Sequence, residues 1–370
     1  MLKLILVGIL VGLIVGAYKV LVCLVGDLYP AISEGIRRDI RFALLWFLFT
    51  VLAIFTVEVM LKKEPAASSG GINQMYLVLH GILRYNPVKV ILTKIFGSLL
   101  VIMSGFSLGR VGPSVQLGGS LAMVLGEGLI DAGIAAGVAA TLEAPITGVV
   151  FTLEVFKIRP TLYKIVTLLF ASVPAALVSK LMFPMRFWPS FEYSYGLFDY
   201  LLILLLGIFT GLYSSAFMQL LFKLRKFLVK RSYKFVPSLL FSWFFILLLP
   251  QVLGGGKLLL WSLMKESIVS LDILILLLIL KSIHTLFSAA SDAPGGLFCP
   301  SLAMGAIIGS ILGKKFVVPG MVGVLAGVYK APLTPILLMF ETGVTPKVIP
   351  GLLLSSLISY LITIKTLKTE

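Results

Sequence analysis

The amino-acid sequence is most informative at residues 109–116, which read GRVGPSVQ. The glycines allow another backbone to approach closely, and Pro113 suits the first turn of a helix, where no backbone N–H is needed. We therefore predict a loop that enters a helix here. Because the first turn of a helix carries free N–H groups and a partial positive charge, an anion can bind there without a basic side chain.

Two other glycine-rich breaks have the same character. The sequence reads SSGG at residues 68–71 and PGGLFCP at residues 294–300, and an apolar segment follows each break. Both segments are too short to cross a bilayer, so each indicates a helix that begins inside the membrane. We expect the three helix starts to converge near the bilayer midplane and to hold a small anion weakly enough to release it.

The chain contains an internal duplication. Pro113 and Pro300, each followed by serine, have the same spacing in the sequence as the two Ala-Pro pairs that begin at Ala144 and Ala331. One spacing for two separate motifs predicts two membrane repeats, residues 1–190 and 191–370, which together form one transmembrane domain. Basic clusters in non-equivalent loops favour an inverted arrangement of the repeats.

The composition requires a lipid environment. Hydrophobic residues make up 59% of the chain and charged residues 13%, which is more apolar surface than one soluble core can bury. We predict an all-α, multi-pass integral membrane protein, located in the plasma (inner) membrane, with many tilted and re-entrant helices. Long apolar runs occupy residues 2–25, 42–60, 162–181, 200–222, 236–253 and 348–364.

The basic residues indicate topology rather than nucleic-acid binding. The net charge is +15, but the cations cluster between apolar runs, most densely at residues 223–234. The positive-inside rule assigns this loop and the Lys62-Lys63 pair to the cytoplasmic side, and binding of an anionic lipid is the alternative interpretation. We expect the lipid bilayer and a small monovalent anion as partners.

No pattern typical of an enzyme occurs in the sequence. A His-Glu-x-x-His helix, a serine nucleophile elbow and a phosphate-binding loop are all absent, so we expect no enzymatic activity, no cofactor and no metal site. His80 and His284 have no second ligand at metal spacing and are interpreted as packed or interfacial residues. Cys23 and Cys299 are interpreted as buried free thiols.

At the glycine-rich breaks the sequence resembles the CLC family of chloride channels and proton-coupled chloride exchangers, and the resemblance covers nearly the whole chain. Residues 109–113 are similar to the family's Gly-Arg-Glu-Gly-Pro signature, residues 295–300 to its Gly-x-Phe-x-Pro signature, and residues 69–73 are a degraded match to Gly-Ser-Gly-Ile-Pro. The resemblance implies a homodimer with inverted repeats and one anion pathway in each subunit. It places the pathway at Ser69, Gly70, Gly71, Arg110, Val111, Gly112, Leu297 and Phe298, with backbone amides of Val111, Leu297 and Phe298 facing the anion.

Departures from the family pattern bear on the mechanism. Val111 stands where the signature has a glutamate that competes with the anion and carries protons, and Val155 stands at a second proton-handling position. Valine cannot titrate, so the main prediction is a passive chloride channel with Val111 at the gate position. The alternatives are a proton-coupled exchanger that uses a non-standard carboxylate such as Glu143, a fluoride- or nitrate-preferring relative, and a membrane scaffold that has lost transport.

Side-chain ligands for the anion are expected to be few. The register of the degraded signature places Gly70 where the family has a serine, with Ser69 one residue earlier. The chain ends soon after Ile364, so we expect a short prokaryotic-type protein without the family's last helix, its tyrosine ligand or C-terminal regulatory domains. Tyr360, inside the preceding helix, is a poor substitute for that tyrosine. Glu154 and Glu341 occupy equivalent positions in the repeats and are interpreted as structural.

Overall fold

The computed structural model describes residues 1–182, 184, 193–265 and 270–367. These residues form sixteen α-helices and five short 3-10 helices, and their only β interaction is an isolated bridge. The predicted boundary between residues 190 and 191 lies outside the described residues, so the division into two repeats at that point stays a proposal. The all-α, polytopic fold class is confirmed.

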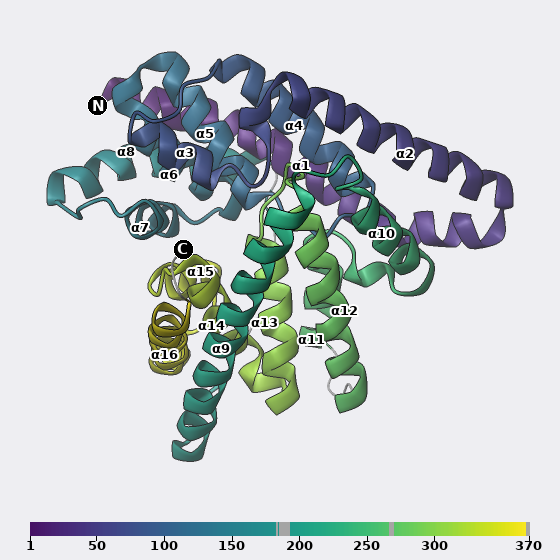
Figure 1. Ribbon diagram of the computed structural model, residues 1–370. Helices are drawn as coiled ribbons and strands as arrows, with labels where there is room; N and C mark the ends of the chain where they lie inside the picture. Colours follow the sequence, from purple (N-terminus) through teal and green to yellow (C-terminus); the bar gives the residue numbers. More distant parts are fainter. Residues whose placement is uncertain (183, 185–192, 266–269, 368–370) are drawn as a thin grey trace.

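The helices fall into two groups that follow one another along the chain. The first group comprises α1 (Leu2–Arg38), α2 (Ile40–Lys63), α3 (Ile72–Leu79), α4 (Pro87–Met103), α5 (Val111–Leu125), α6 (Ile130–Leu142), α7 (Pro145–Val155) and α8 (Leu162–Met182). The second comprises α9 (Leu197–Leu228), α10 (Val236–Leu248), α11 (Lys257–Lys265), α12 (Leu271–Ala290), α13 (Phe298–Leu312), α14 (Val317–Tyr329), α15 (Thr334–Glu341) and α16 (Ile349–Thr366). In Figure 1 the first group, purple to teal, lies above the second, green to yellow.

Short 3-10 helices lie between α-helices in both groups. They are η1 (Pro65–Ala67), η2 (Glu127–Leu129), η3 (Pro250–Val252), η4 (Lys314–Phe316) and η5 (Pro346–Val348). The order α5–η2–α6–α7 corresponds to α13–η4–α14–α15, and the first three elements of each series begin at the constant spacing that separates Pro113 from Pro300. Equal spacing of whole elements is what a duplicated chain requires.

Among the residues that the structure describes, six helices are long and apolar enough to cross a membrane: α1, α2, α8, α9, α12 and the helix that ends at Thr366. The 37 residues of α1 correspond to roughly 55 Å, well beyond the roughly 30 Å of a bilayer core, so α1 must tilt or extend beyond the core. The apolar run at residues 236–253 is not one span, because α10 ends at Leu248 and η3 follows at Pro250. Helices α5 and α13, with 15 residues each, are too short to cross, as predicted.

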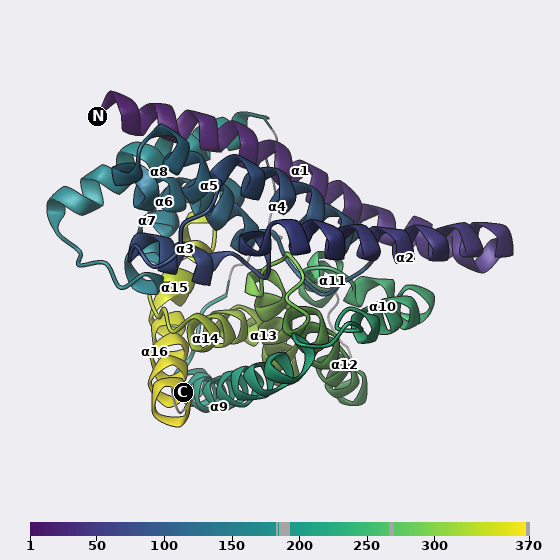
Figure 2. The ribbon, with the colours of Figure 1, turned by 45° about the horizontal axis from the view of Figure 1, so that its top comes forward.

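Glycines bring the long helices into backbone contact. A Cβ added at Gly8 of α1 would lie 2.4 Å from the carbonyl oxygen of Ala171 in α8. A Cβ at Gly211 of α9 would lie 2.8 Å from the carbonyl oxygen of Ser359 in α16. Both pairs of helices lie side by side in Figure 2. These glycines are packing positions, because close helix contact in lipid needs small residues.

Two carboxylates connect the helix groups at equivalent places. The Glu341 carboxylate accepts hydrogen bonds from the backbone N–H of Ile146 and Thr147, at 2.9 and 2.6 Å, at the start of α7. The Glu154 carboxylate accepts from the backbone N–H of Leu333 and Thr334, both at 2.8 Å, at the start of α15. Each helix start is thus capped from the other group, and both glutamates are structural, as predicted.

Glu341→Ala should lower the free energy of unfolding by about 1–2 kcal/mol, because two N–H groups at the start of α7 lose their partner. A denaturant titration of the purified protein measures this change. Glu127→Ala, which removes an exposed carboxylate in η2, is the matched control and should have little effect. Equal stability of the two variants would contradict the capping role.

Candidate anion-binding site

The centre of the site is a pair of glycine backbones. Gly109 and Gly296 exchange two N–H···O hydrogen bonds of 2.7 Å, which form the isolated bridge. The two glycines have the same spacing as Pro113 and Pro300, so the bridge joins equivalent points of the two series of elements. It places the starts of α5 and α13 next to each other although these helices belong to different groups.

A third helix start closes the arrangement. A Cβ added at Gly112 would lie 2.8 Å from the carbonyl oxygen of Gly70 and 3.0 Å from the Cα of Gly296. The loop before α3 is held in place by the backbone N–H of Ser69, which donates to the carbonyl of Asp292 at 2.9 Å. The structure therefore brings together the breaks at residues 68–71, 109–113 and 294–298, as the sequence predicted.

The helix starts leave backbone donors unused. In the described part of the chain, the backbone N–H groups of Val111, Gly112, Leu297 and Phe298 donate to no backbone or side-chain acceptor. Val111 is fully buried and Phe298 is 1% exposed, so water has little access to these donors. Unpaired N–H groups at two converging helix starts can donate hydrogen bonds to an anion.

Cavities approach the site from two sides. The inner cavity, about 430 Å³, is lined by Ser69, Gly70, Gly71 and Leu297, and the outer cavity, about 100 Å³, by Arg110 and Phe298. The names inner and outer follow from the predicted topology. Arg225 of the inner cavity directly precedes the basic loop at residues 229–234, which the positive-inside rule assigns to the cytoplasm. The two cavities share no lining residue, and Val111 lines neither. Val111 lies between Arg110, which lines the outer cavity, and Gly112, whose backbone lies close to Gly70 and Gly296 of the inner cavity.

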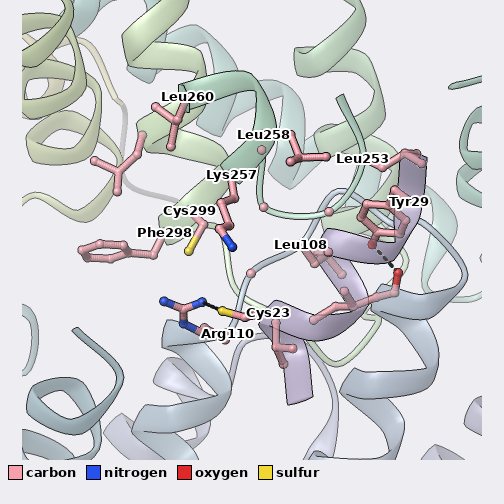
Figure 3. A pocket seen from close by; sticks show the side chains of 18 of the residues that line it. Cys23, Tyr29, Leu108, Arg110, Leu253, Lys257, Leu258, Leu260, Phe298 and Cys299 are labelled. Carbon is pink, nitrogen blue, oxygen red and sulfur yellow. Dashed lines mark hydrogen bonds between the residues drawn. The ribbon is translucent and has the colours of Figure 1, made fainter. Parts of the chain in front are cut away.

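Arg110 contributes a positively charged side chain to the wall of the outer cavity. Its Nη1 donates to the Sγ of Cys23 at 2.7 Å, and Figure 3 shows Cys23, Arg110 and Cys299 around the same space. Neither cysteine takes part in a disulfide, as predicted, but both are half-buried, so the prediction that they are buried is corrected. Their presence in one cavity could not be predicted, because they lie near opposite ends of the sequence.

Two buried lysines support the loops around the site. The Lys94 Nζ donates to the carbonyl oxygens of Ser68 and Ser69, at 3.2 and 2.8 Å. The Lys281 Nζ donates to those of Val252 and Gly254, at 2.6 and 2.8 Å, behind the loop that lines the outer cavity. These lysines have the same spacing as the paired motifs, so the duplication of the sequence contained a signal for them, which the motif-based prediction missed.

A charged, an aromatic and an apolar side chain also line the inner cavity. Arg225 lines it and forms an ion pair with Asp292, at 2.8 Å between Nε and Oδ1. Tyr329 lines it as well, and its ring packs 5.5 Å from that of Phe298. Val155, the second predicted proton-handling position, also faces this cavity. Arg225 lies in the basic cluster interpreted as a topology signal, and Tyr329 lies two residues before the Ala331-Pro332 pair, but neither pattern assigned these side chains to the site.

Glu143, the predicted alternative proton site, lines neither cavity. It ends α6 in the left-handed conformation, with φ of 55°, directly after Leu142 of the outer cavity. Its carboxylate is 8% exposed and accepts a hydrogen bond of 2.8 Å from the Nζ of Lys19 in α1. Lys19 in turn donates to the Oγ of Ser179 at 2.8 Å. This pair is a buried charge cluster within reach of the outer cavity.

The histidines take no part in the site. The Nδ1 of His80 lies 2.8 Å from the carbonyl oxygen of Tyr76, within the same turn of helix. His284 is fully buried in α12, where its ring packs against Phe241 and Phe245 and its Nε2 lies 3.2 Å from the Oγ of Ser242. Both positions agree with the interpretation as packed or interfacial residues.

Comparison with known proteins gives consistent matches. Residues 52–363 match the family model described as voltage gated chloride channel. The chain is 28% identical to the H(+)/Cl(-) exchange transporter ClcA of Vibrio cholerae, over 95% of this chain and 83% of the relative. It is 29% identical to the transporter of the same name from Vibrio parahaemolyticus, over 84% and 75%.

Solved structures show the same fold. A slow cyanobacterial Cl-/H+ antiporter superposes with a TM-score of 0.87 at 24% identity, covering 98% of this chain and 93% of the other. A CLC-type fluoride/proton antiporter superposes with a TM-score of 0.84 at 22% identity, covering 98% and 94%. At these identities the two structures support the fold alone.

Gly296→Ala should disrupt the site, because the new Cβ would lie 2.8 Å from the backbone nitrogen of Gly112 and neither backbone can move freely. We expect a loss of about 1–3 kcal/mol in the free energy of unfolding together with loss of anion binding. Gly128→Ala, which adds a Cβ with no neighbour within 4 Å, is the control. Wild-type anion binding by Gly296→Ala, measured by calorimetry, would show that the bridge does not form the site.

Proposed function

Because the chain belongs to the voltage-gated chloride channel family, we propose that it transports small monovalent anions, chloride first among them, across a membrane. The observation that carries the proposal is the pair of helix starts joined by Gly109 and Gly296, whose N–H groups are unpaired. Cavities on both sides give an anion a way to and from this point.

The chemistry of the site fits a monovalent anion that must leave again. Helix starts offer partial positive charge, so they replace part of the hydration shell without the strong attraction of a direct salt bridge. The full charge of Arg110 stands in the wall of the outer cavity, where it raises the local concentration of anions, whereas Arg225 in the wall of the inner cavity is paired with Asp292.

We propose that transport is coupled to protons. The main prediction from the sequence, a passive channel, is not supported by the comparisons, whereas the alternative of exchange fits the curated relatives, which are named as H(+)/Cl(-) exchange transporters. The carboxylate we assign to the proton is Glu143, which is buried, paired with Lys19 and adjacent to the outer cavity. Protonation would neutralise Glu143 and break its ion pair with Lys19.

Passive conduction is the second candidate, and one observation favours it. Val111, fully buried between the two cavities, and Val155, in the wall of the inner cavity, are apolar where the family pattern has titratable groups. A chain without carboxylates at these points has no proton carrier on the pathway itself. The choice between the candidates rests on whether Glu143 replaces those groups.

The remaining features are proposed on the resemblance. We propose a homodimer, a bacterial inner-membrane location and one anion pathway in each subunit. Among anions, chloride is favoured over fluoride and nitrate because the curated relatives are named for chloride. The structural match to a fluoride/proton antiporter shows the fold alone and does not change this order.

The test is a flux assay on chloride-loaded liposomes that contain the purified protein, with a chloride electrode and a pH electrode in the same vessel. Proton uptake that tracks chloride release in a fixed ratio supports exchange. Chloride release on addition of a potassium ionophore, without proton movement, would establish the passive channel instead. Absence of chloride release would contradict anion transport.

Glu143→Gln should reduce proton movement at least about tenfold while chloride still moves, because an amide cannot carry a proton. Glu127→Gln, which changes an exposed carboxylate, should keep the wild-type ratio of protons to chloride. The same two electrodes give this ratio for each variant. An unchanged ratio in Glu143→Gln would move the proton pathway away from this residue.

Val111→Glu should place an ionisable plug between the two cavities. We expect chloride flux to fall at neutral pH, where the carboxylate is charged and repels or replaces the anion, and to recover as acid neutralises it. Val111→Gln introduces nearly the same shape as Val111→Glu and no charge, so its flux should not depend on pH in this way. Undiminished, pH-independent flux in Val111→Glu would mean that residue 111 does not lie on the pathway.

A further inference from the structure

A third cavity, about 360 Å³, lies between the end of α2 and the loop that joins α9 to α10. The upper end of α9 in Figure 1 leads into this loop. Four cationic side chains line the cavity, together with the backbone region of Ser68: Lys62, Lys230, Arg231 and Lys234. The acidic residues in its wall are Glu58 and Asp292.

Three of these cations have no acidic partner. Lys62 pairs with Glu58 at 3.0 Å, but in the ranges that the structure describes no carboxylate lies within ion-pairing distance of Lys230, Arg231 or Lys234. Some cations elsewhere form ion pairs, among them Arg225 with Asp292, Lys257 with Asp27 and Lys315 with Asp199. The cavity therefore concentrates positive charge that the protein does not itself neutralise.

Aromatic rings position two of these three cations. The guanidinium carbon of Arg231 lies 5.0 Å from the centroid of the Phe227 ring, and the Nζ of Lys234 lies 4.9 Å from that of Phe235. A ring face attracts a cation without accepting its N–H donors in conventional hydrogen bonds. The donors of Arg231 and Lys234 thus remain available to a ligand.

We propose that this cavity binds a phosphate group, carried either by an anionic lipid headgroup or by a soluble phosphorylated molecule. A phosphate offers several charged oxygens, which match the fork of an arginine and the point charges of lysines. The position at the end of a membrane-spanning helix, on the face assigned to the cytoplasm, gives access to both sources. The site is separate from the anion pathway, and binding there does not require that transport be coupled or passive.

The third cavity lies next to the inner cavity of the proposed anion pathway. Ser68 lines the third cavity and Ser69 the inner one, and Lys94 donates to the carbonyls of both. Asp292 lines the third cavity, while its ion-pair partner Arg225 lines the inner one. A phosphate in the third cavity therefore adds negative charge next to the inner cavity, which lowers the local concentration of small anions and raises the KM for chloride on that side.

Binding is tested with pyrophosphate as the probe, by calorimetry on the full-length protein in a zwitterionic detergent. The double variant K230Q/R231Q should bind on the order of tenfold or more weakly, because it loses charge-assisted hydrogen bonds. The matched control is K223Q/K226Q, which removes the same charge from exposed positions that line none of the three cavities. This control should bind pyrophosphate as the wild type does.

The source of the phosphate is decided by flux in two kinds of vesicle. In phosphatidylcholine vesicles, pyrophosphate on both sides should raise the KM for chloride if soluble molecules are the ligands. In vesicles that also contain phosphatidylglycerol, the KM should be raised without pyrophosphate if the headgroup is the ligand. In either case the effect must disappear in K230Q/R231Q and persist in K223Q/K226Q. The proposal is overturned if neither ligand acts, or if the two double variants respond alike.

Discussion

The backbone pair between Gly109 and Gly296 is the contact on which the rest of the site depends. Its two hydrogen bonds of 2.7 Å bring the starts of α5 and α13 together, and the absence of side chains lets Gly70 and Gly112 close in around them. The arrangement leaves backbone N–H groups unpaired in the interior, at a cost of about 1–3 kcal/mol for each group. An anion that accepts hydrogen bonds from these groups offsets that cost. The Gly109–Gly296 bridge therefore underlies both the close packing of the helix starts and the proposed anion binding.

Equivalent positions in the two series of elements have kept their geometry and changed their chemistry. Glu154 and Glu341 still cap each other's helix group, and Lys94 and Lys281 still support equivalent loops. Glu143 and Lys330, in contrast, both end a helix in the left-handed conformation before an Ala-Pro pair, yet carry opposite charges. These two equivalent helix ends therefore differ in charge although their backbones correspond.

The sequence predicted those features that depend on local backbone chemistry. Glycine and proline at residues 109–113 and 294–300 indicate helix starts, and α5 and α13 begin at Val111 and Phe298. Features made by distant partners could not be predicted: the glutamate caps join opposite halves of the chain, and Cys23 meets Arg110 across the outer cavity. The passive-channel prediction rested on two valines, and a missing carboxylate at one position does not show that no other carboxylate, such as Glu143, takes over its role.

The central claim is that a small anion is held by the backbone N–H groups where α5 and α13 begin. Crystals of the protein soaked in bromide, which replaces chloride and scatters anomalously, test this directly. The account predicts an anomalous peak within hydrogen-bonding distance of the N–H groups of Val111, Gly112, Leu297 or Phe298. Bromide bound only at basic side chains in the cavities, with no peak at these helix starts, would contradict it.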